Sequence, residues 1–166
     1  MNEEAIHTWF DVRCSDGPGW TSPDFDCYHE TPIELRVFVA MRKLEAEISN
    51  GGLPQLLWNT FYHWRELLND CETAYGLMGA DVQRDAIQAF RALFLVHEAE
   101  CSKYVSRCIQ ERDFSYFDKW CKYGAPRMGS EREKLFWTAA YTELETKRKI
   151  WIDQNREQLI ELMEEP

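Results

Sequence analysis

The stretch Glu47-Ile48-Ser49-Asn50-Gly51-Gly52-Leu53-Pro54-Gln55 separates two segments of helical pattern and decides how the chain folds. Asn and Gly tolerate positive φ and stop helices, so residues 50–52 predict a turn. Upstream, Thr31-Pro32-Ile33-Glu34 combines an N-cap residue, a proline at the first helical position and a capping-box glutamate. We therefore expect a helix from there to about Ser49, and one or two helices from Leu53 to about Met78.

The remaining segments also carry helical signals. Asp81 is placed to cap a helix that continues to roughly Ile109, and Gly79 supplies the stop before it. The pattern Ser130-Glu131-Arg132-Glu133 is a second capping box, and no Gly or Pro interrupts the chain between it and Pro166. We expect one unbroken C-terminal helix of more than about thirty residues. Shorter helices are predicted over residues 3–13 and 114–123, with a loop over residues 14–30.

No segment shows sustained alternation of apolar and polar residues, so strands are not required anywhere. The sequence predicts an all-α fold: one domain over residues 1–166, a multi-helix bundle with a long C-terminal helix. Apolar residues make up 45% of the 166 residues, with 7 Trp, 9 Phe and 7 Tyr, enough for a core without disulfides. The cysteines have no Cys-x-x-Cys spacing, so we expect reduced thiols, most of them in the core. They are Cys14, Cys27, Cys71, Cys101, Cys108 and Cys121.

Acidity dominates the composition, with 29 Asp and Glu against 19 Lys and Arg and a net charge of -10. Phosphate backbones and anionic lipids are therefore disfavoured ligands, and the favoured partner is a basic protein. The first residues carry no secretory signal pattern, and no stretch approaches about 18 consecutive apolar residues. We expect a cytoplasmic protein that binds neither nucleic acid nor membrane directly.

Patterns for catalysis or metal binding are weak in this sequence. His97-Glu98-Ala99-Glu100-Cys101 begins like a helical zinc motif, but Cys101 stands where the second histidine is needed. Cys14, Cys27 and His29 share one loop, yet no fourth ligand is indicated. No serine context resembles a nucleophile turn, and no glycine loop follows a strand to hold a phosphate. The sequence therefore predicts no enzyme, no catalytic residue, no metal site and no cofactor.

The negative charge is clustered along the chain. Residues 1–30 contain seven acids and one Arg, and residues 66–102 contain seven acids and two Arg. In the last predicted helix, four acids follow one another at intervals of four residues, which places them in one row. Apolar residues such as Trp151 and Leu159 lie on the opposite side, so this ridge faces solvent. The predicted partner-binding acids are Asp153, Glu157, Glu161 and Glu165 in the ridge and Asp24, Asp26 and Glu30 near the N-terminus.

Such a row has two interpretations. Carboxylates four residues apart on a helix are roughly 6 Å apart along its axis, while a DNA strand carries a charge about every 3.4 Å. Rows on neighbouring helices would together approximate phosphates and offer a basic DNA-binding groove the charges it normally binds. A merely solvated helix face carries the same pattern. Residues 103–134, with eight Lys or Arg against five acids, indicate that one surface is not acidic.

The run from Glu47 to Asn59, followed by Leu67-Leu68-Asn69-Asp70-Cys71-Glu72-Thr73-Ala74-Tyr75-Gly76-Leu77-Met78-Gly79-Ala80, resembles a bacterial family of helical proteins, the DNA mimic protein family. The resemblance covers residues 45–95, within a family-like core over residues 31–110. Its signature is an Asn-Gly-Gly-x-x-Gln turn with an Asn one helical turn further on. Leucines stand around the Gln where the family often has Phe or Tyr. The matching residues are Asn50, Gly51, Gly52, Gln55 and Asn59, which we interpret as structural, with the amides satisfying helix-end backbone groups.

The resemblance implies an all-helical homodimer whose acidic surface occupies the DNA-binding face of a transcription factor, of helix-turn-helix type, and prevents operator binding. A DNA-mimic regulator is therefore the leading hypothesis. The same electrostatics fit an immunity-type inhibitor of a basic toxin or nuclease. A third hypothesis is a small enzyme with Glu47, Gln55 or His63 in a cleft at the Asn-Gly-Gly turn. The aromatic residues Trp58, Phe61, Tyr62 and Trp64 are either core or interface, and their burial decides between the two.

Overall fold

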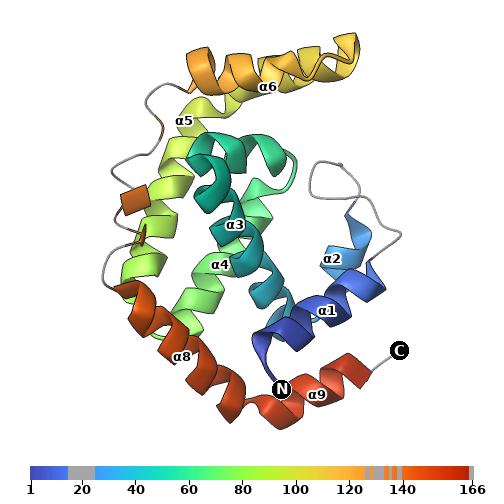
Figure 1. The fold of residues 1–166 in the computed structure, drawn as a ribbon, viewed down its shortest axis with the longest axis vertical. Coiled ribbons are helices and arrows are strands. Elements are labelled where there is room, and N and C mark those ends of the chain that lie inside the picture. Colours follow the sequence, from blue (N-terminus) through green and yellow to red (C-terminus); the bar gives the residue numbers. More distant parts are fainter. Residues whose placement is uncertain (15–24, 126–127, 129–132, 135, 138–139, 165–166) are drawn as a thin grey trace.

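The computed structural model describes residues 1–14, 25–125, 128, 133–134, 136–137 and 140–164, and within this part of the chain every regular element is a helix (Figure 1). The all-α prediction is confirmed. The elements are α1 (Glu3–Arg13), α2 (Asp26–Glu30), α3 (Ile33–Asn59), α4 (Trp64–Leu77), α5 (Asp81–Glu111), α6 (Ser115–Lys119), the π-helix η1 (Trp120–Gly124), α8 (Ala140–Gln154) and α9 (Arg156–Glu164).

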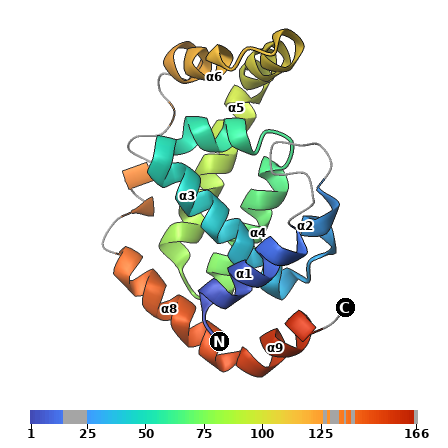
Figure 2. The same ribbon diagram turned by 45° about the vertical axis from the view of Figure 1, so that its right-hand side comes forward.

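Helices α3, α4 and α5 form the centre of the bundle (Figure 2). Trp64 of α4 packs edge-to-face against Phe94 of α5, with ring centroids 5.6 Å apart. Tyr75 of α4 and Phe90 of α5 both pack against Phe136, which follows η1 in the sequence. Aromatic side chains at helical spacing therefore fix the faces that α4 and α5 turn to each other. Among the described helices, none combines the length and the apolar character needed to cross a membrane.

Helix α3 is kinked at Gly52, where φ is 73°. The predicted turn is therefore present as a sharp bend, and helix resumes directly after it to Asn59. The carboxylate of Glu133 closes the bend, because the N–H of Leu53 donates to its Oε1 at 2.7 Å. A Cβ on Gly52 would lie 2.5 Å from the same oxygen. Glycine is thus required here both for the positive φ and for the space.

Two of the predicted N-caps are wrong. Thr31 does not cap α3, because its hydroxyl donates to the carbonyl of Cys27 at 2.8 Å and so completes the end of α2. Asp81 is the first residue of α5 and forms an ion pair with Arg84 at 3.0 Å instead of capping the helix. The predicted stop at Gly79 is confirmed, since its φ of 64° ends α4 with the left-handed residue typical of helix C-termini.

The predicted unbroken C-terminal helix is wrong, because it is divided at Asn155 into α8 and α9. At this break the side-chain Nδ2 of Asn155 donates to the carbonyl of Trp151 at 2.8 Å, and the same carbonyl accepts the backbone N–H of Asn155 at 3.1 Å. Helix α9 therefore changes direction and crosses the end of the bundle (Figure 1). Of the predicted capping box, residues 130–132 lie outside the described residues, and Glu133 bonds to Leu53.

Cys14 and Cys27 form a disulfide, so the prediction that the cysteines are thiols is wrong for this pair. Their Cα atoms are 5.7 Å apart although 13 positions separate them in sequence. The prediction missed the pair because α1 and α2 approach each other only in the folded chain. The free cysteines are Cys71 and Cys101, which are buried, and Cys108 and Cys121, which are half-buried.

Replacing Gly52 by alanine should destabilise the protein by roughly 2 kcal/mol or more, because L residues rarely adopt its φ and the added Cβ meets Glu133. The free energy of unfolding in urea measures the effect. Gly76→Ala is the control, since a Cβ there finds only the Cδ of Arg84 at 3.9 Å. That change should leave stability unaltered or raise it by up to about 1 kcal/mol. Equal losses for both variants would contradict the role of the kink.

Candidate functional site

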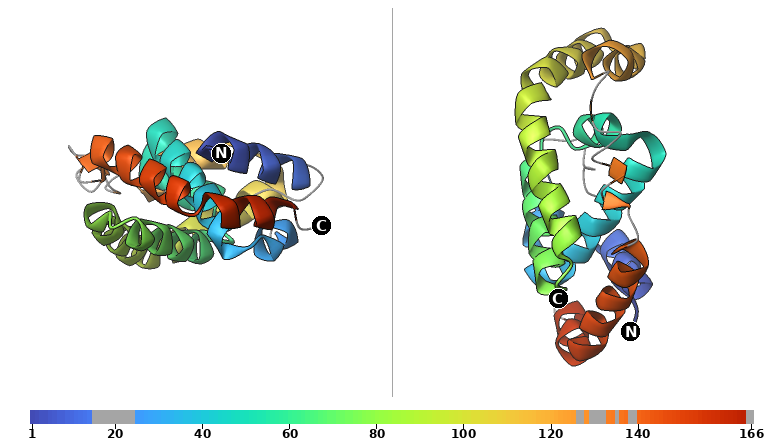
Figure 3. Two further views of the ribbon diagram at one scale, coloured as in Figure 1. Left: turned by 90° about the horizontal axis from the view of Figure 1, so that it is seen from below. Right: turned by 90° about the vertical axis from the view of Figure 1, so that its left-hand side faces the viewer.

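The N-terminal and C-terminal helices meet at one end of the bundle, where α9 runs beside α1 (Figure 3, left). Trp9 of α1 donates its Nε1–H to the carbonyl of Met163 in α9 at 2.9 Å. On its other side α9 reaches the start of α3, where Gln158 Nε2 donates to Glu34 Oε1 at 3.5 Å. Leu159 is fully buried beneath α9, so the opposite side of this helix faces solvent.

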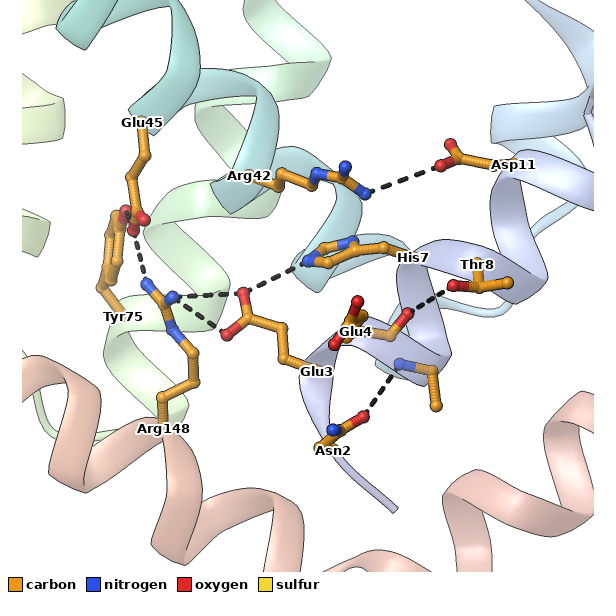
Figure 4. A network of polar contacts seen from close by, with 11 residues as sticks. Asn2, Glu3, Glu4, His7, Thr8, Asp11, Arg42, Glu45, Tyr75 and Arg148 are labelled. Carbon is orange, nitrogen blue, oxygen red and sulfur yellow. Dashed lines mark hydrogen bonds and ion pairs between the residues drawn. The ribbon is translucent and has the colours of Figure 1, made fainter.

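A buried arginine fastens α8 to α1 and α3 (Figure 4). Arg148 is only 8% exposed, and its Nη1 donates to both carboxylate oxygens of Glu3, at 3.1 and 3.0 Å. Its Nη2 donates to Oε1 of Glu45. Tyr75 of α4 donates its hydroxyl to the same Glu45 oxygen at 3.2 Å, and His7 Nε2 lies 3.3 Å from Glu3 Oε1. This network joins four helices and fixes the positions of α1 and α8.

The charges in this network influence one another. Burial raises the pKa of Glu45 above its ordinary value, against the attraction of Arg148. Burial acts in the same direction on Glu3, but the hydrogen bond with His7 and the charge of Arg148 hold the pKa of Glu3 below its ordinary value. Burial disfavours a charged guanidinium, yet Glu45 and Glu3 raise the pKa of Arg148. The arginine is therefore charged in the folded protein, although its buried Nε finds no hydrogen-bond partner among the described residues.

Exposed carboxylates that form no ion pair with any described residue gather on α1, α2, the end of α8 and α9. We call this set the acidic face. Exposed cations on the same helices are fewer, namely Arg13, Lys149 and Arg156. The local charge is therefore negative and not neutralised within the protein. The acidic face consists of Glu4, Asp26, Glu30, Asp153, Glu157, Glu161 and Glu164.

Five of the seven acids predicted to bind a partner belong to this set, namely Asp26, Glu30, Asp153, Glu157 and Glu161. Its N-terminal and C-terminal parts approach each other because the start of α1 and the end of α8, including Asp153, line one cavity of about 330 Å³. Two predicted acids, Asp24 and Glu165, lie outside the described residues. Sequence reasoning missed Glu4 and Glu164. Glu164 does not belong to the row of acids spaced four residues apart, and the sequence distinguishes Glu4 only by its place in the first turn of α1.

The second acidic segment, residues 66–102, contributes little free negative charge. Glu72 pairs with Arg91, and Glu98 pairs with Arg65, each at 2.6 Å. The other ion pairs of this segment are Asp70 with Arg36, Asp81 and Asp85 with Arg84, and Glu100 with Lys103. The count of acids along the sequence therefore overstated the free negative charge of this segment, since all of its carboxylates except Glu66 are paired with cations on the same or neighbouring helices.

The family motif surrounds a buried carboxylate, Glu47, which is 6% exposed. Gln55 Nε2 and Asn59 Nδ2 donate to its Oε2 at 2.7 and 2.8 Å, and Lys43 donates to its Oε1. The expectation that these amides satisfy helix-end backbone groups is therefore wrong, because they hold Glu47. A Cβ on Gly51 would lie 2.2 Å from the Gln55 side chain. The absence of a side chain at Gly51 therefore leaves room for the Gln55 amide. Gln55 and Asn59 therefore hold a buried carboxylate, and a structural role for the motif as a whole stays a prediction.

Of the residues considered for catalysis or metal binding, Glu47, His63 and Cys101 are buried, whereas Cys14, Cys27 and His97 are half-buried and His29 is exposed. Both oxygens of Glu47 are engaged, and His63 is 5% exposed with its ring 5.3 Å from that of Phe25. Cys101 is buried beside His97, on the helix that resembled a zinc motif. Within the described part of the chain, no three His, Cys, Asp or Glu side chains are grouped to hold a metal ion.

The aromatic residues of the α3–α4 connection divide between core and surface. Trp64 is 1% exposed and belongs to the core, whereas Tyr62 is 40% exposed. Trp58 and Phe61 are half-buried and line a groove of about 440 Å³ with the end of α5. Phe114, 83% exposed, stands at the same groove. This part of the surface is apolar and lies on different helices from the acidic face.

The fold and this surface define the class: a small all-helical protein with an acidic face that its own cations do not neutralise. The sequence matches the family described as DMP19-like protein over residues 29–155, more than half of the chain. It therefore belongs to the DMP19-like protein family. Membership suggests a DNA-mimic role with a DNA-binding protein as partner. No curated protein and no solved structure matches the chain significantly.

Replacing Arg148 by methionine should destabilise the protein by about 3 kcal/mol or more at neutral pH, because Glu3 and Glu45 then lose their buried counter-charge. Both carboxylates then bind protons more readily folded than unfolded. The variant's deficit should therefore shrink as the pH falls and these two groups become neutral. Unfolding in urea at several pH values measures it.

Lys149→Met is the matched control, because Lys149 is exposed on the same helix and forms no ion pair with a described residue. It should change the free energy of unfolding by less than about 0.5 kcal/mol at every pH. If the deficit of Arg148→Met stayed constant with pH, the network would not act through charge.

Proposed function

We propose that this protein is a DNA mimic that binds the DNA-binding surface of a transcription factor through its acidic face and so prevents operator binding. The observation that carries the proposal is the set of exposed carboxylates on α1, α2, the end of α8 and α9, which outnumber the exposed cations of the same helices and form no ion pair with a described residue. Like charges one helical turn apart oppose a helix by about 0.2–0.5 kcal/mol for each pair. A basic partner relieves this repulsion and is steered towards the face by its charge.

The acidic face offers charges in rows. Glu157 and Glu161 lie one helical turn apart on α9, roughly 6 Å along the axis, and Asp153 precedes them at the end of α8. The side chain of Trp9 holds α1, with Glu4, beside α9. Neighbouring rows of this kind resemble the phosphate path of DNA in charge and lack the base edges that carry sequence information. Such a surface competes with the positioning contacts of a DNA-binding protein.

The carboxylates are set in place before a partner arrives. Arg148 fixes α8 to α1 through Glu3, and buried Leu159 seats α9 on the bundle. Groups that are already ordered lose less conformational entropy on binding. A smaller part of the favourable electrostatic free energy is then offset, so the affinity is higher. The expected partner is a helix-turn-helix regulator, whose groove-facing surface carries the Lys and Arg that contact phosphates.

We further propose that the protein acts in the cytoplasm as a homodimer, the arrangement that the family resemblance implies. A twofold dimer presents two copies of the acidic face. Helix-turn-helix regulators commonly bind two half-sites as dimers, with one DNA-reading helix for each half-site. Two acidic faces therefore match the symmetry of such a partner.

Neutralising Glu157 and Glu161 together with glutamine should weaken partner binding by about tenfold or more at low salt. The partner is captured from cell lysate on the immobilised protein, eluted with salt and purified, and its Kd is measured at two salt concentrations. Glu66→Gln with Asp118→Asn is the control, because both residues are exposed, form no ion pair with a described residue and lie on α4 and α6. This control changes the net charge equally and should leave the Kd unchanged.

A helix-turn-helix regulator that is displaced from the protein by its own operator DNA supports mimicry. Recovery of a basic nuclease that the protein inhibits would replace this proposal with an immunity-type inhibitor. Equal weakening by both double variants would show that net charge acts without a defined face, and no weakening by either would reject the assigned surface.

A further inference from the structure

A disulfide connects two of the helices that carry the acidic face. Cys14 ends α1, with its N–H donating to the carbonyl of Phe10 at 2.9 Å, and Cys27 lies in α2. Both cysteines are half-buried. Asp26 adjoins Cys27, and Glu30 lies one helical turn further on. The bond therefore lies beside two carboxylates of the acidic face.

The two helices are also held by contacts that do not involve the disulfide. Tyr28 of α2 donates its hydroxyl to Asp70 at 2.6 Å, and its ring stacks on Phe25 with centroids 4.9 Å apart. The first turns of α1 are held by Glu3, through Arg148, and by Trp9. Opening the disulfide therefore releases the end of α1 and the start of α2 from each other while the core stays assembled. Elements that move in regulation commonly open locally in this way, without unfolding of the core.

The remaining thiols compete poorly for oxidation. The thiolate is the form that attacks a disulfide, so a raised pKa lowers reactivity. Burial raises the pKa of Cys71 and of Cys101 well above the ordinary value for a thiol. Burial also raises the pKa of Cys108 and of Cys121. The four free thiols are therefore weak nucleophiles for exchange with a soluble disulfide.

We propose that Cys14 and Cys27 form a thiol–disulfide switch that fixes or loosens the acidic face according to the redox state of the surrounding thiol pool. This inference rests on the function proposed above. With the bond closed, Asp26 and Glu30 of α2 keep a defined arrangement relative to the end of α1. With the bond open, the arrangement loosens, and partner binding must order it again at a cost in affinity.

The oxidant is a low-molecular-weight disulfide such as oxidised glutathione. The thiolate of one cysteine attacks it, its S–S bond breaks, and one glutathione thiol leaves with a mixed disulfide on the protein. The second cysteine then displaces the other glutathione, and the Cys14–Cys27 bond forms. Two protein thiols have lost two electrons and two protons, which two glutathione thiols now carry. Excess reduced glutathione reverses both steps.

The test uses the whole protein in buffers of fixed ratios of oxidised to reduced glutathione. Free thiols are blocked with N-ethylmaleimide, mass spectrometry of peptides gives the fraction of the disulfide, and circular dichroism follows the fold. We expect the Cys14–Cys27 fraction to follow the ratio while the helix content stays constant. Amide hydrogen exchange in residues 10–14 and 26–30 should rise by about tenfold or more on reduction, with α4 and α5 unchanged.

Two double variants serve as controls. Cys14→Ser with Cys27→Ser should show the exchange pattern of the reduced protein in every buffer. Cys108→Ser with Cys121→Ser removes the half-buried free thiols and should keep the full redox response. A disulfide that opens only when the protein unfolds, or equal exchange in both redox states, overturns the switch.

Binding separates this inference from the proposed function. The regulator captured in the lysate experiment should bind the oxidised protein about three- to tenfold more tightly than the reduced protein. If Glu157→Gln with Glu161→Gln abolishes binding while redox state alters neither exchange nor affinity, the switch is rejected and the function stands. If reduction alters exchange while those variants bind normally, the switch stands and the function assigned to the face is rejected.

Discussion

The position of the acidic face depends on one buried cation, Arg148. Removing a guanidinium from water costs several kcal/mol, and Glu3 and Glu45 offset this cost from two different helices. An arginine suits the position because its planar fork reaches both carboxylates at once, whereas a lysine offers a single point charge. Glu3 and Arg148 are 145 positions apart in the sequence. Their pairing therefore brings acids from both ends of the chain to one end of the bundle.

A second buried carboxylate, Glu47, explains why the Asn-Gly-Gly-x-x-Gln pattern marks the fold. Gln55 and Asn59 bind its oxygens, and Gly52 allows the kink that brings them there. The family match ends at residue 155, so α9 lies beyond it, and α1 lies before its start at residue 29. The family thus identifies the bundle, while the flanking helices supply most of the acidic face. Family membership and surface charge are therefore separate arguments for DNA mimicry.

Features with a local cause were predictable from the sequence, and features with a tertiary cause were not. Helical periodicity and the Gly79 stop depend on neighbouring residues and were predicted correctly. The break at Asn155 was missed because Asn carries a weaker stop signal than Gly or Pro. The Cys14–Cys27 pair depends on how α1 meets α2. Likewise, the ridge on α9 was predicted as exposed, but only the fold shows that its described carboxylates form no ion pair with a described residue while most of those in residues 66–102 are paired.

The charge is also distributed unequally along the long axis of the molecule. The acidic face lies at the end formed by α1 and α9, while α6 and η1 lie at the opposite end (Figure 1). That opposite end carries Lys103, Arg107, Lys119 and Lys122 on or near its helices, partly matched by acids such as Asp113. In the electrostatic field of a basic partner, a charge distribution of this kind rotates the protein so that the acidic face points towards the partner as the two approach. The asymmetry therefore favours productive orientation before any contact forms, and it acts over a distance limited by screening to about 10 Å at 0.1 M salt.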